Sequence, residues 1–302
     1  MRIFNTLEDV KLNNNTSVAL GAFDGLHLGH RKVIESVIGC GFSPSVFTFS
    51  EDPSKSLHGE TEYLLTHEDK VSTLEEMGVE NLFSVNFDSV KSLSSEEFFH
   101  DILMDKLHAK VIACGNDFRF GKFAKGDVKL LEKLCMENDV ELKVVDPAMM
   151  NGEVISSTLI REALKNGDSL LAGKMLGRAF GFTSEVVTGN KLGRTIGIPT
   201  INQPLPEGFV KPKFGVYAVL VHIGGSTYWG VCNIGVKPTV GVYLPLAETW
   251  IGDFEGDVYG EKVKLEVFDF IRPERKFDSL EELRDEIKRN AVVARKKLKN
   301  RI

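Results

Sequence analysis

The sequence contains few cysteines, and their spacing excludes several classes of protein. Only four occur in 302 residues, Cys40, Cys114, Cys135 and Cys232, and no two of them form a CxxC pair. Disulfide scaffolds and zinc ribbons need closely spaced cysteines. We therefore expect neither a disulfide framework nor a structural zinc site, and we expect a reducing compartment.

Long apolar runs and an excess of positive charge are also missing. No stretch approaches the roughly 18 apolar residues of a membrane helix, and residues 1–5 lack the apolar core of a signal peptide. The formal net charge of −6 argues against a nucleic-acid binder held by bulk charge. We expect a cytoplasmic protein, a monomer or transient homo-oligomer, whose partners include no membrane and no nucleic acid.

The first half of the chain alternates strand and helix patterns. Short apolar runs predict strands at 17–20, 45–49, 110–114 and 140–145. One-sided apolar spacing predicts helices around 33–38, 66–77, 94–107 and 128–134. Such alternation is typical of a doubly wound α/β domain, in which helices cover both faces of a parallel sheet. Ligands of these domains bind beyond the carboxyl ends of the strands.

The pattern changes after about residue 178. Strand-like runs at 184–187, 216–222, 228–233 and 262–270 are punctuated by glycine and proline, which indicates an antiparallel β-barrel or sandwich. Ser279 and Glu282 have capping-box spacing and predict a terminal helix, with Leu283, Ile287, Ala294 and Leu298 facing inward. Its basic end, 295–301, is expected to be a solvated face. We expect two domains, 1–178 and 179–302.

A glycine-rich turn after the first strand is the sharpest local feature. Gly21, Gly25 and Gly29 allow tight turns and close approach to a ligand, and His27 and His30 flank the last of them. A helix begins at this point, where backbone N–H groups and the helix dipole favour an anion. Two imidazoles there can donate hydrogen bonds to phosphate oxygens that gain charge in a transition state.

The turn and two later segments resemble one family. GAFDGLHLGH at 21–30 resembles the GxFDGxHxGH signature of nucleotidyltransferases, in particular of bacterial FAD synthetases. CGNDFRFG at 114–121 is similar to the GxDFRFG motif of these synthetases. ISSTLIR at 155–161 matches their ISSTxIR motif. The resemblance implies that His27 and His30 are catalytic. It assigns ATP binding to Gly21, Phe23, Asp24, Gly25, Gly29, Ser157, Thr158 and Arg161, and flavin binding to Asn116, Asp117 and Phe118.

The implied reaction is an attack by the FMN phosphate on the α-phosphorus of ATP, with pyrophosphate leaving and no covalent enzyme intermediate. The family continues its second strand as TFxPxP, whereas residues 48–53 read TFSEDP and contain one proline. Many relatives also have asparagine where this chain has Ala22.

A second constellation, GNKLGRTIGIPTIN, spans residues 189–202. It fails the spacing of a P-loop and precedes no helix. Thr200 and Asn202 alternate, so in an extended segment both side chains face one side, and a hydroxyl and an amide oxygen suit Mg²⁺. The segment resembles the GxxxGRxxGxPTxN signature of riboflavin kinases.

Later segments match the same kinases in the same order: KFGVYA at 213–218, NIGVKPT at 233–239, residues 248–260 and RPERKF at 272–277. The resemblance implies that Glu248 is the catalytic base, that Thr200 and Asn202 bind Mg²⁺, and that Arg272 and Arg275 lie near the flavin. It assigns ATP binding to Gly189, Lys191, Gly193, Arg194, Phe214, Gly215 and Tyr217. Trp250 stands where the family usually has histidine.

These motifs predict a bifunctional enzyme that phosphorylates riboflavin to FMN and adenylylates FMN to FAD, using ATP and Mg²⁺. One alternative is a monofunctional riboflavin kinase with a degenerate adenylyltransferase domain, which the altered 48–53 segment favours. Another is a flavin or nucleotide binding protein without turnover. The presence of His27, His30 and Glu248 counts against the latter, because a binder needs no base.

Overall fold

The computed structural model describes residues 1–50, 62–189, 193, 197–239 and 242–299, and the chain divides into two compact units. The first comprises Met1–Thr61 and His67–Ser156, and the second comprises Glu62–Thr66 and Ser157–Ile302. Each unit is described by itself below. A short segment from the first half of the sequence thus belongs to the second unit.

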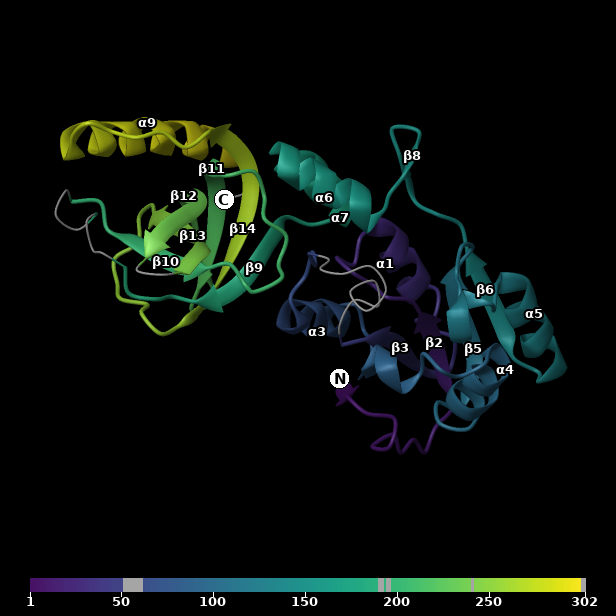
Figure 1. Cartoon of the computed structure of the whole chain (residues 1–302). Coiled ribbons are helices and arrows are strands. Elements are labelled where there is room, and N and C mark those ends of the chain that lie inside the picture. Colours follow the sequence, from purple (N-terminus) through teal and green to yellow (C-terminus); the bar gives the residue numbers. More distant parts are fainter. Residues whose placement is uncertain (51–61, 190–192, 194–196, 240–241, 300–302) are drawn as a thin grey trace. The chain divides into compact units, whose positions relative to one another are not determined.

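The first unit is built on a parallel sheet of six strands in the order β1-β4-β3-β2-β5-β6 (Figure 1). The strands are β1 (Arg2–Phe4), β2 (Thr16–Leu20), β3 (Ser43–Phe49), β4 (Asn81–Val85), β5 (Ala109–Gly115) and β6 (Glu141–Val145). From β2 the chain moves outward through β3 to β4, and then returns to place β5 on the other side of β2. The strand order therefore reverses between β2 and β5, which is where ligands bind in such sheets.

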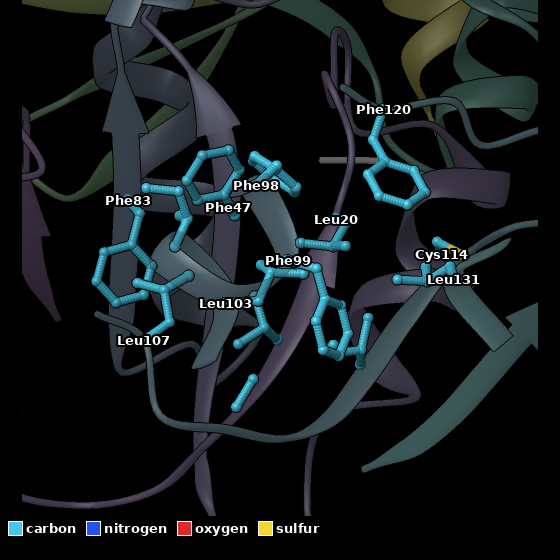
Figure 2. Packing of buried hydrophobic residues seen from close by; sticks show 14 of the residues in the cluster. Leu20, Phe47, Phe83, Phe98, Phe99, Leu103, Leu107, Cys114, Phe120 and Leu131 are labelled. Atoms are coloured by element: carbon cyan, nitrogen blue, oxygen red, sulfur yellow. The ribbon is translucent and has the colours of Figure 1, made fainter. Parts of the chain in front are cut away.

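Helices cover both faces of this sheet, which confirms the doubly wound prediction. The elements are α1 (Leu28–Glu35), α3 (His67–Glu76), η1 (Phe87–Ser89), α4 (Ser95–Glu97), η2 (Phe98–Met104), η3 (Lys122–Ala124) and α5 (Val128–Glu137). Val18 and Leu20 of β2 share a core with Phe99 of η2 and Leu131 of α5. Figure 2 shows this packing around Phe99. On the opposite face, the Ser17 hydroxyl donates to the carbonyl of Val37, just beyond α1.

Two parts of this unit differ from the sequence prediction. The segment 94–107 begins with the expected capping box of Ser94 and Glu97, but it continues as a π-helix over Phe98–Met104. Strands β1 and β4 were not predicted. β4 is fully buried but contains polar residues, and Asn81 bonds to side chains of β3 and β1, to Ser45 Oγ at 3.0 Å and from Arg2 Nε at 2.9 Å.

A two-stranded hairpin, β7 (Met149–Met150) and β8 (Glu153–Val154), ends the first unit. The second unit begins with α6 (Ser157–Asn166) and α7 (Ser169–Leu176). Its sheet is antiparallel, in the order β10-β13-β12-β11-β14-β9. The strands are β9 (Phe180–Glu185), β10 (Thr200–Pro204), β11 (Gly215–Ile223), β12 (Ser226–Thr239), β13 (Val242–Ile251) and β14 (Lys262–Arg272).

The edges of this sheet meet, as the barrel prediction requires. Val187, just after β9, forms an antiparallel bridge with Asn202 of β10, and its N–H donates to the Asn202 carbonyl at 2.8 Å. The terminal helix α9 (Leu280–Leu298) is capped by Ser279, whose hydroxyl accepts from the N–H of Glu282 at 3.1 Å. Ala294 and Leu298 of α9 are buried against β11 and β12, as their spacing predicted.

Strand β13 was missed by the sequence analysis, which interpreted residues 248–251 only as a motif. Figure 1 shows β13 within the sheet of the second unit, where it pairs with β10 and β12. None of the described helices is long and apolar enough to cross a membrane. All four cysteines are free thiols, as expected from their spacing.

Candidate active sites

The first candidate site lies at the carboxyl ends of β2 and β5. The glycine-rich turn follows β2, and the 114–121 motif follows β5, its neighbour in the sheet. Ala19 of β2 is paired with Ala113 of β5, so the two motifs leave the sheet side by side. The topology thus places both predicted motifs at the reversal of strand order.

The turn has an unusual backbone. Phe23 has φ 51° and Leu26 has φ 45°, and both side chains are buried, while Gly25 between them has φ 78°. Non-glycine residues in the left-handed region are strained and gather at functional sites. Gly21 cannot be replaced without movement, because a Cβ there would lie 2.9 Å from the Phe23 ring. Asp24 and Gly29, the other two predicted ATP ligands of this turn, are half-buried.

His27 is the N-cap of α1. Its Nδ1 accepts from the N–H groups of Gly29 at 3.2 Å and of His30 at 3.3 Å. An Nδ1 that accepts carries no proton, so the neutral ring carries its proton on Nε2. The imidazole of His27 therefore occupies two of the backbone N–H groups at the start of this helix.

The rings of His27 and His30 stack with centroids 3.6 Å apart and an interplanar angle of 21°. Burial lowers the pKa of His30 well below its ordinary 6.5, the charges of His27 and Lys70 lower it further, and a hydrogen bond with the Asp24 backbone opposes them. His30 is therefore neutral at physiological pH. A neutral imidazole can donate one N–H to a phosphate oxygen without repelling a neighbouring cation.

The predicted flavin residues follow β5 directly. The N–H of Asn116 donates to the carbonyl of Val145 at 3.2 Å, and Asn116 and Asp117 are exposed. The Phe118 ring is half-buried and stacks on Phe120 at 5.8 Å. The exposed amide and carboxylate are available to a ligand at this edge of the sheet.

The third adenylyltransferase motif lies on α6, in the second unit. Helix α6 begins at Ser157 itself, so Ser156 rather than Ser157 stands before its first residue. Thr158 is exposed, and Arg161 is half-buried and donates from Nε to the carbonyl of Glu62 at 2.5 Å. The structure places these residues in a different unit from His27 and His30.

The second candidate site is a cavity of about 360 Å³ against the barrel strands and α9. Thr200, Asn202 and Glu248 all line it. Asn202 is paired with Glu248, which is paired with Asn233 of β12, so these three side chains form a row across one face of the sheet. The predicted base and the predicted metal ligands thus come together, although 46 residues separate Asn202 from Glu248 in the sequence.

The glycines of the 189–202 motif fit closely around this row. A Cβ at Gly189 would lie 2.4 Å from Asn202 Nδ2, and one at Gly193 would lie 2.2 Å from the carbonyl oxygen of Ile198. Gly193 also lines the cavity. The predicted ATP ligands Lys191 and Arg194 lie outside the described residues.

The GVYA motif forms the start of β11. The three ATP ligands predicted here, Phe214, Gly215 and Tyr217, differ in burial. Gly215 has φ 151°, and a Cβ there would lie 2.4 Å from the Arg272 carbonyl. Phe214 is half-buried. Tyr217 is fully buried, and its hydroxyl donates to the carbonyl of Lys213.

Arg272 and Arg275 line the cavity, and an unpredicted residue holds them there. Glu286 of α9 is only 8% exposed and forms ion pairs with both arginines, since Arg272 Nε lies 3.1 Å from its Oε1 and an Arg275 guanidinium nitrogen lies 3.4 Å from its Oε2. A hydrogen bond from Arg289 is the largest cause that lowers the pKa of Glu286. Glu286 lies outside the motifs matched in the sequence, so no sequence signal pointed to it.

A second, larger cavity of about 650 Å³ lies beside the first and shares Thr200 and Trp250 with it. Three carboxylates line it, those of Asp253, Glu255 and Asp257. The Trp229 indole N–H donates to Asp253 Oδ2 at 2.9 Å, and Trp229 meets Trp250 edge-on at 5.3 Å. The sequence analysis missed Trp229, which lies outside the motifs.

The residues around Thr200 fit a magnesium ion. Mg²⁺ prefers oxygen ligands and keeps part of its coordination for water and substrate phosphates. Thr200, Asn202 and Glu248 offer hydroxyl, amide and carboxylate oxygens at this cavity, and the absence of a side chain at Gly189 lets its backbone lie close to the Asn202 amide. No group of three or more His, Cys, Asp or Glu within the described ranges could hold a metal.

Comparison with known proteins matches two family models to this chain. The FAD synthetase family model matches residues 9–159, and the riboflavin kinase model matches residues 176–298. The chain is 38% identical over 291 residues to the bifunctional riboflavin kinase/FMN adenylyltransferase of Bacillus subtilis, covering 92% of this chain and 90% of that protein. The chain belongs to the bifunctional riboflavin kinase/FMN adenylyltransferase family.

Two further proteins are similar to this chain along most of its length. The Escherichia coli K12 protein of the same name is 35% identical over 294 residues, which is 92% of this chain and 91% of that one. A crystal structure from Streptococcus pneumoniae, of a protein named as a macrolide-efflux protein, is 32% identical and superposes with a TM-score of 0.88 over 97% of this chain and 98% of that chain. Its fold is shared along nearly the full length.

Proposed function

We propose that this chain is a bifunctional enzyme of FAD biosynthesis, which phosphorylates riboflavin to FMN and then adenylylates FMN to FAD. Both steps use ATP. The observation that carries the proposal is that one chain matches both family models, the FAD synthetase model over residues 9–159 and the riboflavin kinase model over residues 176–298. The monofunctional alternative is disfavoured because both family models match and the relatives of this chain are named as bifunctional enzymes.

In the kinase step, Glu248 accepts the proton of the ribityl 5′-hydroxyl while that oxygen attacks the γ-phosphorus of ATP, and ADP leaves. Riboflavin occupies the smaller cavity, where Arg272 and Arg275 border it and the apolar side chains of Leu283 and Ile287 cover it. The ion pairs with Glu286 fix the two guanidinium groups before the substrate arrives.

The adenosine of ATP occupies the larger cavity. A triphosphate carries several negative charges, so the carboxylates of Asp253, Glu255 and Asp257 repel it from the far wall. The phosphates therefore lie near Thr200, which both cavities share, and the γ-phosphate reaches the cavity that contains Glu248. The adenine ring of ATP then lies near the aromatic side chains of Trp250, Phe254 and Tyr259.

In the adenylyl transfer, an oxygen of the FMN phosphate attacks the α-phosphorus of ATP, and pyrophosphate leaves. The neutral rings of His27 and His30 donate to phosphate oxygens as negative charge moves toward the leaving group. No protein nucleophile takes part. Burial is the main cause that raises the thiol pKa of three cysteines to about 12, namely Cys114, Cys135 and Cys232.

Thr200 and Asn202 would hold Mg²⁺, which when bound neutralises charge on the ATP phosphates. The remaining proposals concern the whole chain. They are a domain boundary near residue 178, a cytoplasmic location, a monomeric or transiently oligomeric state, and no nucleic-acid partner, the last in keeping with the net charge of −6.

Incubation of the purified chain with riboflavin, ATP and Mg²⁺, followed by chromatographic separation of the flavins, tests the proposal. We expect FAD, with FMN as an intermediate. FMN alone would instead support the monofunctional alternative, and unchanged riboflavin would support a binding protein without turnover.

A further inference from the structure

Cys40 and Lys143 form a contact within the first unit that neither proposed reaction uses. Cys40 lies in the connection between α1 and β3, and Lys143 lies on β6, the edge strand of the parallel sheet (Figure 1). The Lys143 ammonium donates to Cys40 Sγ at 3.2 Å, although the two residues are 103 positions apart in the sequence. Folding of this unit therefore places a primary amine against a thiol.

The Ser36 carbonyl, at the end of α1, binds both groups. The Cys40 thiol donates to this oxygen at 3.3 Å, and the Lys143 ammonium donates to it at 3.2 Å. Glu141, also on β6, has a carboxylate oxygen 3.7 Å from the same ammonium. The hydrogen bond with Cys40 is the largest cause that raises the pKa of Lys143. A shared acceptor thus keeps the lysine nitrogen next to the sulfur.

The other three cysteines have different surroundings. Cys114, Cys135 and Cys232 are buried, and burial is the main cause that raises the pKa of each thiol to about 12. Cys40 is half-buried, and the side chain of Lys143 is 33% exposed. A small oxidant from solvent can therefore reach the Cys40 sulfur, whereas the buried thiols stay covered and protonated at neutral pH.

We propose that Cys40 and Lys143 form a redox modification site, at which a peroxide converts their contact into a covalent S–N bond. In the first step, the Cys40 sulfur attacks hydrogen peroxide, the O–O bond breaks, and the thiol becomes a sulfenic acid with release of water. The sulfur is oxidised by two electrons, and the peroxide is reduced. The neighbouring ammonium stabilises the negative charge on the departing oxygen.

In the second step, the Lys143 nitrogen attacks the sulfenic sulfur. The S–N bond forms and the S–O bond breaks. The nitrogen gives up two protons, one to solvent and one to the departing hydroxyl, which leaves as a second water. The product is a sulfenamide, the bond that sulfenic acids also form with backbone nitrogen.

This bond has a protective consequence for Cys40. Sulfenic acid and its condensation products return to the thiol under reduction, whereas further oxidation to sulfinic acid is irreversible. Because the amine is already in contact with the sulfur, it captures the sulfenic acid before a second peroxide does. The site is therefore a reversible one, specific for Cys40 among the four cysteines.

Peptide mapping of the full-length protein tests this inference. The folded wild type is treated with hydrogen peroxide, the remaining thiols are alkylated, and the protein is digested with trypsin without reductant. The peptide containing Cys40 should be joined to a peptide that trypsin has not cut after Lys143, with loss of two hydrogen atoms relative to the separate peptides. Dithiothreitol should release both peptides and restore the Cys40 thiol.

Two variants separate the chemistry of the amine from simple exposure of the thiol. Lys143→Arg keeps a positive charge and hydrogen-bond donors but lacks the primary amine, and Cys40→Ser lacks the sulfur. Neither should give the joined peptides, and Lys143→Arg should contain at least about fivefold more Cys40 sulfinic acid than wild type.

Three results would overturn the inference. The first is wild-type protein whose Cys40 remains a thiol after peroxide treatment. The second is a wild type that forms Cys40 sulfinic acid as readily as Lys143→Arg does. The third is a disulfide between Cys40 and Cys135, which would be recognised because trypsin would still cut after Lys143.

Discussion

His27 and His30 are bound to each other twice: the His27 Nδ1 accepts the His30 N–H at 3.3 Å, and the two rings stack at 3.6 Å. One histidine thus both starts the helix and orients the other. His27 therefore combines the helix cap with the catalytic role proposed for it, and an alanine substitution would remove both.

Replacement of His30 by Ala should lower FMN adenylylation by about 10²–10³, the usual cost of one preorganised transition-state donor. His27→Asn is the sharper variant, because asparagine is a good N-cap but has no group at the position of Nε2. It should keep the melting temperature and lose activity to a similar extent. His100→Asn, at an exposed position, is the control. Normal adenylylation by both His30→Ala and His27→Asn would remove the pair from the mechanism.

The lowered pKa of His30 predicts a direction of pH dependence. The unfolded chain binds a proton near pH 6.5, whereas the folded ring resists it, so this group stabilises the fold above pH 6.5 and the contribution is lost as the pH falls through the lower folded value. NMR titration of the His30 ring should give a pKa well below 6.5, and melting temperatures should fall from pH 7 to pH 5 less steeply in His30→Asn. An ordinary pKa for His30 would contradict the geometry of the site.

Glu248→Gln should separate the two reactions. Glutamine can hydrogen-bond the ribityl hydroxyl but cannot take its proton, and loss of a general base costs about 10²–10⁴ in rate. Riboflavin phosphorylation should fall by that order, while FMN adenylylation stays normal. Glu261→Gln, at an exposed position, serves as the control. Kinase turnover within a few-fold of wild type would exclude Glu248 as the base.

Fragments test the proposed boundary. Residues 179–302 carry every described kinase motif, but α6 and α7 also belong to the second unit, and the Lys213 N–H donates to the Leu164 carbonyl at 2.9 Å. We expect both 179–302 and 157–302 to phosphorylate riboflavin, with the longer fragment melting at a higher temperature. A cooperatively folded 157–302 without kinase activity would count against an independent kinase domain.

Features set by neighbouring residues were predictable from the sequence. The caps at Ser94 and Ser279 depend on a partner three residues away, and both were correctly placed. Thr200 and Asn202 share a face because strands alternate. The cap formed by His27 could have been anticipated, since a polar ring directly before a helix start has two amides within reach.

Features set by distant partners were not predictable. Strand β4 contains Asn81, whose polar side chain is tolerated only because Ser45 and Arg2 supply hydrogen bonds. Arg272 and Arg275 form ion pairs with Glu286, which the sequence places among ordinary surface charges of α9. The bridge between Val187 and Asn202 that joins the sheet edges has no local signature.

Isotope tracing tests the central claim, two reactions in one chain, most directly. Riboflavin is incubated with Mg²⁺ and ATP labelled either at the γ-phosphorus or at the α-phosphorus. Label from the γ-position should appear in FMN and then in FAD, and label from the α-position should appear in FAD and not in FMN. Label in FMN from the γ-position with no α-label in any flavin would contradict the account and leave only the kinase.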